Sequence, residues 1–270
     1  MIAKDKKVGK EAVAVGENEP KKEKKEEALY SRPVALNSER HRNIKIAKVA
    51  DYKIAKQLNS SILTGYEFFE AAKYYPIAFS KTPDEEIMPV AILGITDNAF
   101  TDEEGKWKEG FYIPAFIRRY PYILAKTDDK NGDDLLVAID AAYKGFEAKE
   151  GDRLFDDEGK NTPALDRALE FLKDYNAQFE VTKQFIKRLE ELDLFTAIDA
   201  NIKPADGPSY VMRNLLVVDE GKMLKLEDKE LLTLTRMDDH KRGYISWIYA
   251  HIFSLNNFVK VINKISDSRG

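Results

Sequence analysis

The chain has 270 residues, and its 43% hydrophobic content is enough to form a substantial core. Its 43 basic and 47 acidic side chains leave a formal net charge of −4, so no overall positive field would attract nucleic acid or anionic lipid. The absence of cysteine excludes disulfide bonds, thiolate metal sites and a cysteine nucleophile, but it does not fix the compartment.

Residues 1–28 are predicted to form a mobile charged tail. This segment is rich in Lys and Glu, has few large apolar side chains, and cannot bury enough surface to offset its ordering entropy. Its short AVAV run is not the apolar region of a signal peptide. Residues 29–266 are predicted to form a single domain, because no break in composition divides them.

The first ordered elements are expected to be extended edges around a polar turn, where Pro33 precedes alternating apolar residues. Thr64 is the predicted N-cap of a short helix with Glu67 three positions later, and Pro76 ends that helix. The runs IAFS and MPVAILGIT that follow have the pattern of strands.

Two stretches of the chain align without a gap, AAKYYPIAFSK at 71–81 and FIRRYPYILAK at 116–126. Further along, MPVAILGIT is echoed by DLLVAID, and the acidic turn AFTDEEGK by LFDDEGK. We infer two pseudo-repeated helix-hairpin units, at about 66–106 and 114–160, whose strands share one antiparallel sheet. The alternative is that two common helix-proline-strand units look alike by chance.

The helical C-terminal part, 162–266, begins with Thr162 as N-cap and Pro163 at the first helical position. Apolar residues at helical spacing predict an amphipathic helix of about thirty residues, packed across the sheet rather than in a coiled coil. A polar loop, ANIKPADGPS, is followed by a buried strand ending in an Asp-Glu-Gly turn. A short helix over 228–236 and a final helix over 244–265 complete an α+β fold.

The final helix is predicted to lie in the core rather than in a membrane. Its segment YISWIYAHIFSLNNFVKVINKI carries His251, Asn256, Asn257 and Lys260, which are unfavourable in hydrocarbon. We expect His251 to be a hydrogen-bonded core residue.

Motifs of known catalytic sites are missing from the sequence. It has no Walker or G-x-G-x-x-G loop and no G-x-S-x-G elbow, and its three histidines lack metal-ligand spacing, so we predict no metal and no cofactor. Asp140 and Asp219 each close a probable buried strand and are the best carboxylate candidates; alternatively, each caps the following turn. The acidic DEEGK, DDEGK and DEGK segments are predicted to be turns rather than calcium loops.

Two adjacent arginines interrupt the apolar run FYIPAFIRRYPYILA. Arg118 and Arg119 lie near the end of a predicted helix from Ala115 to Tyr120, where cations stabilise the helix dipole. Neighbouring helical residues diverge by about 100°, so the two cannot lie on the same surface. Because Lys73 aligns with Arg118, we expect Arg119 to be the functional one, with an ion pair to a nearby acid as the alternative.

An ordered series of segments resembles the SapC family of bacterial surface-layer-associated proteins. The series includes RPVALNSERH, FFEAAKYYPIAF, YIPAFIRRYPYILA, LFDDEGKNTPALDRALEFL, LLVVDEGKMLKL and IYAHIFSLNNF. The resemblance covers nearly the whole ordered chain, from Tyr30 to about Phe258. It implies a protein associated with the surface layer or with its export machinery, and it brings no established catalytic residues.

We therefore expect a non-catalytic accessory that binds a protein or peptide client linked to surface-layer export or assembly. Its binding site would be a groove between the two units, where Arg118 or Arg119 pairs with a client carboxylate. Two alternatives stay open: a minor structural component of the layer, and a peptide-modifying enzyme or enzyme partner. The residues of such an enzyme pocket would be Tyr75, Tyr120, Asp140, Asp219 and His251. The expected location is the cytoplasm, with signal-peptide-independent export to the cell surface as the alternative.

Overall fold

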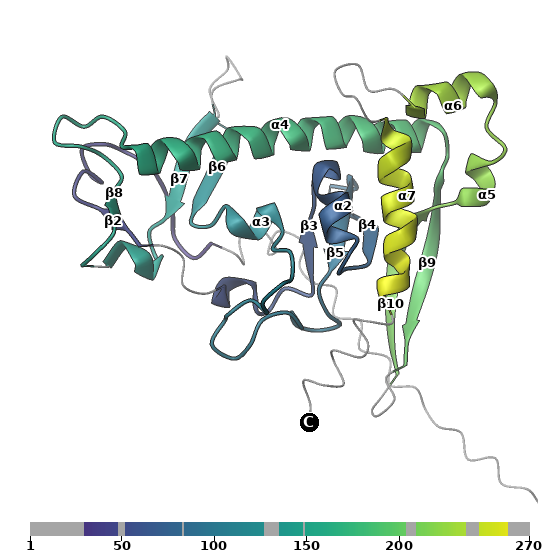
Figure 1. Cartoon of the computed structure of the whole chain (residues 1–270), viewed down its shortest axis with the longest axis horizontal. Coiled ribbons are helices and arrows are strands. Elements are labelled where there is room, and N and C mark those ends of the chain that lie inside the picture. The colour runs from purple at the N-terminus through teal and green to yellow at the C-terminus, as the bar shows by residue number, and fades with distance from the viewer. Residues whose placement is uncertain are drawn as a thin grey trace, which may run out of the picture.

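The structure is a computed structural model that describes residues 30–47, 52–82, 84–126, 135–147, 149–203, 209–235 and 243–258. Its longest element is helix α4, Pro163–Glu191, which Figure 1 shows running across the molecule above two groups of strands. The predictions for the tail at 1–28 and for the chain beyond 258 lie outside the described residues, as does His240, one of the three histidines.

The larger group of strands is a five-stranded antiparallel sheet of order β3-β5-β4-β10-β9. Its strands are β3 (Ser60–Ile62), β4 (Ile77–Lys81), β5 (Ile87–Ile92), β9 (Phe195–Ile202) and β10 (Tyr210–Val218). Helices α2, Phe68–Ala71, and α7, Tyr244–Ser254, pack in front of it in Figure 1. Buried aromatic rings fill this interface, since Phe185 of α4 lies 5.3 Å from Trp247 of α7 and 6.1 Å from Phe68.

The smaller group is a three-stranded antiparallel sheet of order β1-β7-β6. It consists of β1 (Pro33–Ala35), β6 (Tyr122–Lys126) and β7 (Leu135–Asp140), beside the strand pair β2 (Lys45–Ile46) and β8 (Asp152–Arg153). The expectation that both hairpins share one sheet is wrong. The outer edge of β4 is taken by β10, so the second hairpin cannot pair there.

The two hairpins nevertheless have corresponding strand orders. We call α2 together with strands β3-β5-β4 the first hairpin unit, and strands β1-β7-β6 the second hairpin unit. The Ile92 amide donates to the Pro76 carbonyl at 2.9 Å, and the Asp140 amide donates to the Pro121 carbonyl at the same distance. This pairing matches Ile92 with Asp140, one position away from the match that the shared VAI letters suggest. The Tyr120–Pro121 bond is cis, whereas the first corner is not. Internal duplication stays a prediction.

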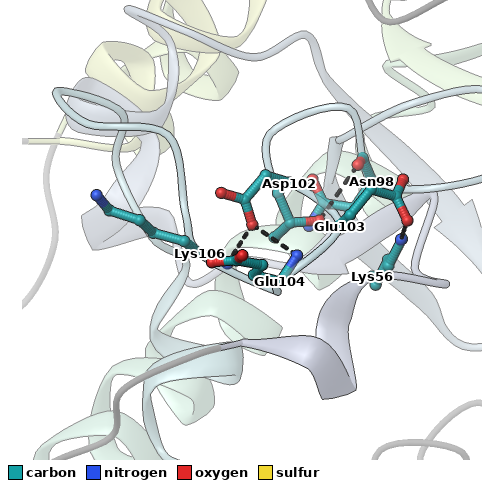
Figure 2. Close-up of polar contacts among 7 residues, drawn as sticks. Lys56, Asn98, Asp102, Glu103, Glu104 and Lys106 are labelled. Carbon is teal, nitrogen blue, oxygen red and sulfur yellow. Dashed lines mark hydrogen bonds and ion pairs between the residues drawn. The ribbon is translucent and has the colours of Figure 1, made fainter.

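The acidic turns of the two units are built alike. Asp102 accepts from the amides of Glu104 and Lys106 at 3.0 and 2.8 Å, as Figure 2 shows, and Asp156 accepts from the two matching amides of its own turn. Gly105 and the matching glycine of the second turn both have φ of +81°, a backbone conformation that favours glycine. The prediction of turns closed by glycine is confirmed for both.

The C-terminal part follows the prediction at its helices and departs from it between them. The 29-residue α4 begins at Pro163, α6 spans Asp228–Thr235, and α7 begins at Tyr244. Strand β9 was not predicted. The Asp-Glu-Gly segment after β10 forms a short helix, α5 (Glu220–Met223), because Asp219 accepts from the Lys222 amide and caps it.

Candidate functional site

Helix α3, Ala115–Arg118, directs two neighbouring arginines to different places. The Arg118 side chain is exposed, whereas Arg119 is only 9% exposed. The predicted divergence of the two side chains is therefore confirmed, and it follows from the turn angle of the helix.

Arg118 is held in a fixed orientation by three groups. Its Nε donates to the Ile113 carbonyl at 2.9 Å, and its Nη2 donates to the Tyr112 hydroxyl at 3.2 Å. The guanidinium carbon lies 5.5 Å from the Tyr112 ring centroid and 5.3 Å from that of Phe171 on α4, within cation–π range. No carboxylate of the described residues forms an ion pair with Arg118, so its outer edge is open to a ligand.

The buried carboxylate of Glu67 positions this arrangement from below. Its Oε1 accepts from the Tyr112 hydroxyl at 2.9 Å and from the Ala115 amide at 2.7 Å, at the start of α3. Its Oε2 accepts from the Thr64 amide at 2.8 Å, which is the predicted capping contact. One carboxylate therefore joins the first unit to α3. Burial, followed by the Glu67 charge, raises the pKa of Tyr112 above its usual range.

Arg119 lies inside, which weighs against the preference for it as the residue that meets a client. Its guanidinium carbon lies 4.3 Å from the Phe116 ring centroid, 5.5 Å from that of Tyr175 on α4 and 5.8 Å from that of Tyr30. A guanidinium enclosed by these rings cannot reach a ligand at the surface. The alignment of Arg118 with Lys73 could not reveal the burial of Arg119, because a sequence alignment does not show which side of a short helix is covered.

Asp140, which is 1% exposed, anchors the N-terminal side of the second unit. Its carboxylate accepts from the amides of Ser31, Arg32 and Ala142, each at 2.9 Å. The Tyr120 hydroxyl lies 3.4 Å from its Oδ2, and burial together with the Asp140 charge raises the pKa of Tyr120. The turn-capping alternative is therefore what the hydrogen bonds of Asp140 show.

His251 is fully buried, as expected for a core histidine. Its Nδ1 lies 2.8 Å from the Ile77 carbonyl, and its Nε2 accepts from the Val218 amide at 3.1 Å, which fits a neutral ring protonated at Nδ1. Burial lowers the pKa of His251 to about 4. The imidazole thus bridges β4 and β10.

Two candidates from the sequence remain, Tyr75 and Asp219. Tyr75 is fully buried, donates its hydroxyl to the Tyr112 carbonyl, and has a pKa raised by burial. Asp219 follows Val218 in the chain and caps α5, away from α3. The structure therefore brings Tyr75 and Arg118 together through Tyr112, and Tyr120 together with Asp140. Within the described residues, no group of three His, Asp or Glu side chains is placed to hold a metal ion.

A family model named SapC matches residues 36–261. The chain belongs to the SapC family. No curated protein and no solved structure is significantly similar to this SapC family member. Over the part of the chain that the structure describes, no helix is both long and apolar enough to cross a bilayer.

Residues of the site that the sequence did not reveal are Tyr112 and Phe171. Tyr112 lies six residues before Arg118, but no repeating pattern marks a contact across the start of a short helix. The contact with Phe171 depends on how α4 crosses α3, which no short-range pattern reveals. The one local signal was Glu67 in the capping box, which predicted its bond to Thr64 but not its bonds to Tyr112 and Ala115.

Proposed function

We propose that this chain is a non-catalytic accessory that binds a protein or peptide client linked to surface-layer export or assembly. The observation that carries the proposal is the exposed guanidinium of Arg118, which is oriented by Tyr112 and Phe171 and lacks an ion pair among the described residues. A guanidinium held in advance loses little side-chain entropy when it binds a carboxylate of a client.

The other candidate side chains support a binding role more than a catalytic one. Both His251 nitrogens contact main-chain groups, the Asp140 and Asp219 carboxylates accept from amides, and the Tyr75 hydroxyl donates to a carbonyl. A general acid or base needs a hydrogen-bonding position open to substrate. The alternatives of a peptide-modifying enzyme and of a minor layer component remain predictions, as does the choice between cytoplasm and cell surface.

We also propose that the two hairpin units arose by internal duplication. The shared strand order, the matching bonds to Pro76 and Pro121, and the similar hydrogen bonding of the two acidic turns support this origin. Family members in which the two units are more alike in sequence would strengthen it.

The test of the binding role is an affinity capture with the full chain. We expect wild type and the control Arg167→Gln, an exposed arginine on α4, to retain the same client, and Arg118→Gln to lose it. The captured client, produced separately, should bind Arg118→Gln at least about tenfold more weakly than wild type. Equal affinity for all three proteins would contradict the proposal.

A further inference from the structure

Strand β6 has one edge to which no strand of the described residues is paired. In an antiparallel pair, backbone groups point alternately toward the partner strand and away from it. The Asp140–Pro121 bond fixes this alternation, so Tyr122, Leu124 and Lys126 of β6 direct their amides and carbonyls away from β7. We call these the outward residues of β6.

The same alternation identifies the outward residues of β4 as Ile77, Phe79 and Lys81, because the Ile92 amide bonds the Pro76 carbonyl. Ile77 is the first outward residue, and side chains meet its backbone. Its amide donates to the Ser254 hydroxyl at 2.8 Å, and its carbonyl contacts His251 Nδ1 at 2.8 Å. Phe79 is the second, and it pairs with Leu216 of the added strand β10.

The backbone groups of Tyr122 on β6 are bonded as those of Ile77 are, but by different partners. Its amide donates to the Arg119 carbonyl at 2.8 Å, and its carbonyl accepts from the Tyr30 hydroxyl at 3.1 Å. Leu124, the counterpart of Phe79, has no described strand opposite it. The two strands also differ in burial, because Phe79 is fully buried whereas Leu124 is half-buried.

We propose that the edge of β6 to which no described strand pairs receives an extended segment of the client as an added antiparallel strand, in the position that β10 occupies on β4. The inference rests on the proposed function and names the form in which the client is recognised. The added segment would carry apolar residues at alternate positions, as β10 does with Leu215 and Val217 buried.

The backbone of Leu124 would supply the central pair of hydrogen bonds. The Leu124 side chain already packs against the core cluster of Tyr122, Leu165 and Leu172, so the edge offers main-chain groups while its side chain stays in place. Recognition through the main chain gives affinity, and alternate side chains of the client give selectivity.

The experiment uses a displayed library of random dodecapeptides, selected on the full chain. We expect enriched peptides with apolar residues at alternate positions that bind Leu124→Pro at least about tenfold more weakly, because proline removes an outward amide without removing a bond to β7. The control Leu124→Val keeps the amide and should bind like wild type.

A second measurement leaves the protein unchanged, since Leu124→Pro could fail to fold. Methylation of backbone nitrogens at alternate residues of an enriched peptide should abolish binding in one register and leave it intact in the other. Absence of enriched peptides, or indifference to methylation in both registers, would overturn the proposal. A dimer that the wild type forms and Leu124→Pro does not would also overturn it, because a second copy would then fill the edge.

Arg118→Gln separates this inference from the proposed function. If the client binds Arg118→Gln more weakly but binds Leu124→Pro like wild type, the added strand is ruled out and the carboxylate contact is retained. If the client binds Leu124→Pro more weakly but Arg118→Gln like wild type, the added strand is retained and the carboxylate contact is ruled out. If the client binds both variants like wild type, both contacts are ruled out.

Discussion

In the first hairpin unit, the first two outward residues of β4 find partners for their backbone groups, whereas of the first two in the second unit only Tyr122 of β6 does so among the described residues. The first unit is completed by α7 and β10, which lie more than a hundred residues later in the chain. The second unit is completed by Tyr30 and by Asp140, which holds the amides of Ser31 and Arg32.

Two similar hairpins therefore differ in role because different segments of the chain cover them. His251 and Tyr30 do the same task, because each side chain contacts the carbonyl of a first outward residue. A buried edge that lacked such partners would be unfavourable. Beyond that residue the first unit has β10, whereas no strand of the described residues pairs with the second unit at the corresponding edge.

The largest expected effect is on the anchor of the second unit. Asp140→Ala should lower the free energy of unfolding by about 4 kcal/mol, because it leaves three amides without their charged acceptor. Asp140→Asn keeps one carbonyl oxygen and should lose about half as much. Denaturant unfolding measures both, and variants as stable as wild type would show that Asp140 is no anchor.

The next effect belongs to the first unit and depends on pH. His251 has a pKa of about 4 when folded and about 6.5 when unfolded, so between these values only the unfolded chain takes up the proton. Its contribution to stability is complete above pH 6.5 and is lost as the pH falls, by about 3 kcal/mol near pH 4.

The control for this pH dependence is His251→Asn, which keeps a donor for the Ile77 carbonyl and cannot titrate. Unfolding measured from pH 7 to pH 4 should show a smaller loss of stability for this variant than for wild type. Parallel curves would mean that His251 is not neutral and buried in solution.

The smallest effect tests whether the Tyr30 hydroxyl stabilises the carbonyl of Tyr122 as the His251 ring stabilises that of Ile77. Tyr30→Phe keeps the ring beside Tyr120 and removes the hydroxyl that donates to the Tyr122 carbonyl, so the free energy of unfolding should fall by about 1 kcal/mol. Tyr249→Phe alters an exposed tyrosine on α7 and serves as the control. No difference between the two variants would remove Tyr30 from the comparison.

The sequence predicted those parts of the fold that local rules decide. Thr162 and Pro163 marked the start of α4, and the glycines at 105 and 159 marked tight turns, because each signal lies within a few residues of the feature. Strand β9 escaped prediction because Asp199 and Asn201, which are rare in strands, make its second half resemble the polar loop that follows.

The sequence could not decide which edges pair or which charges are covered. The pairing of β10 with β4 is a contact between distant segments, and it separates the two sheets. The crossing of α4 over Arg119 is another such contact, and it buries this arginine. For the candidate site, the sequence supplied Arg118 and Glu67, but not Tyr112, which links them.

Strand β10 covers the edge of β4, whereas no strand of the described residues covers the edge of β6, and amide hydrogen exchange tests this difference most directly. In the full chain without added ligand, the Phe79 amide should exchange at least about 100-fold more slowly than the Leu124 amide, since only Phe79 faces a paired strand. Equal protection of the two amides would contradict the account.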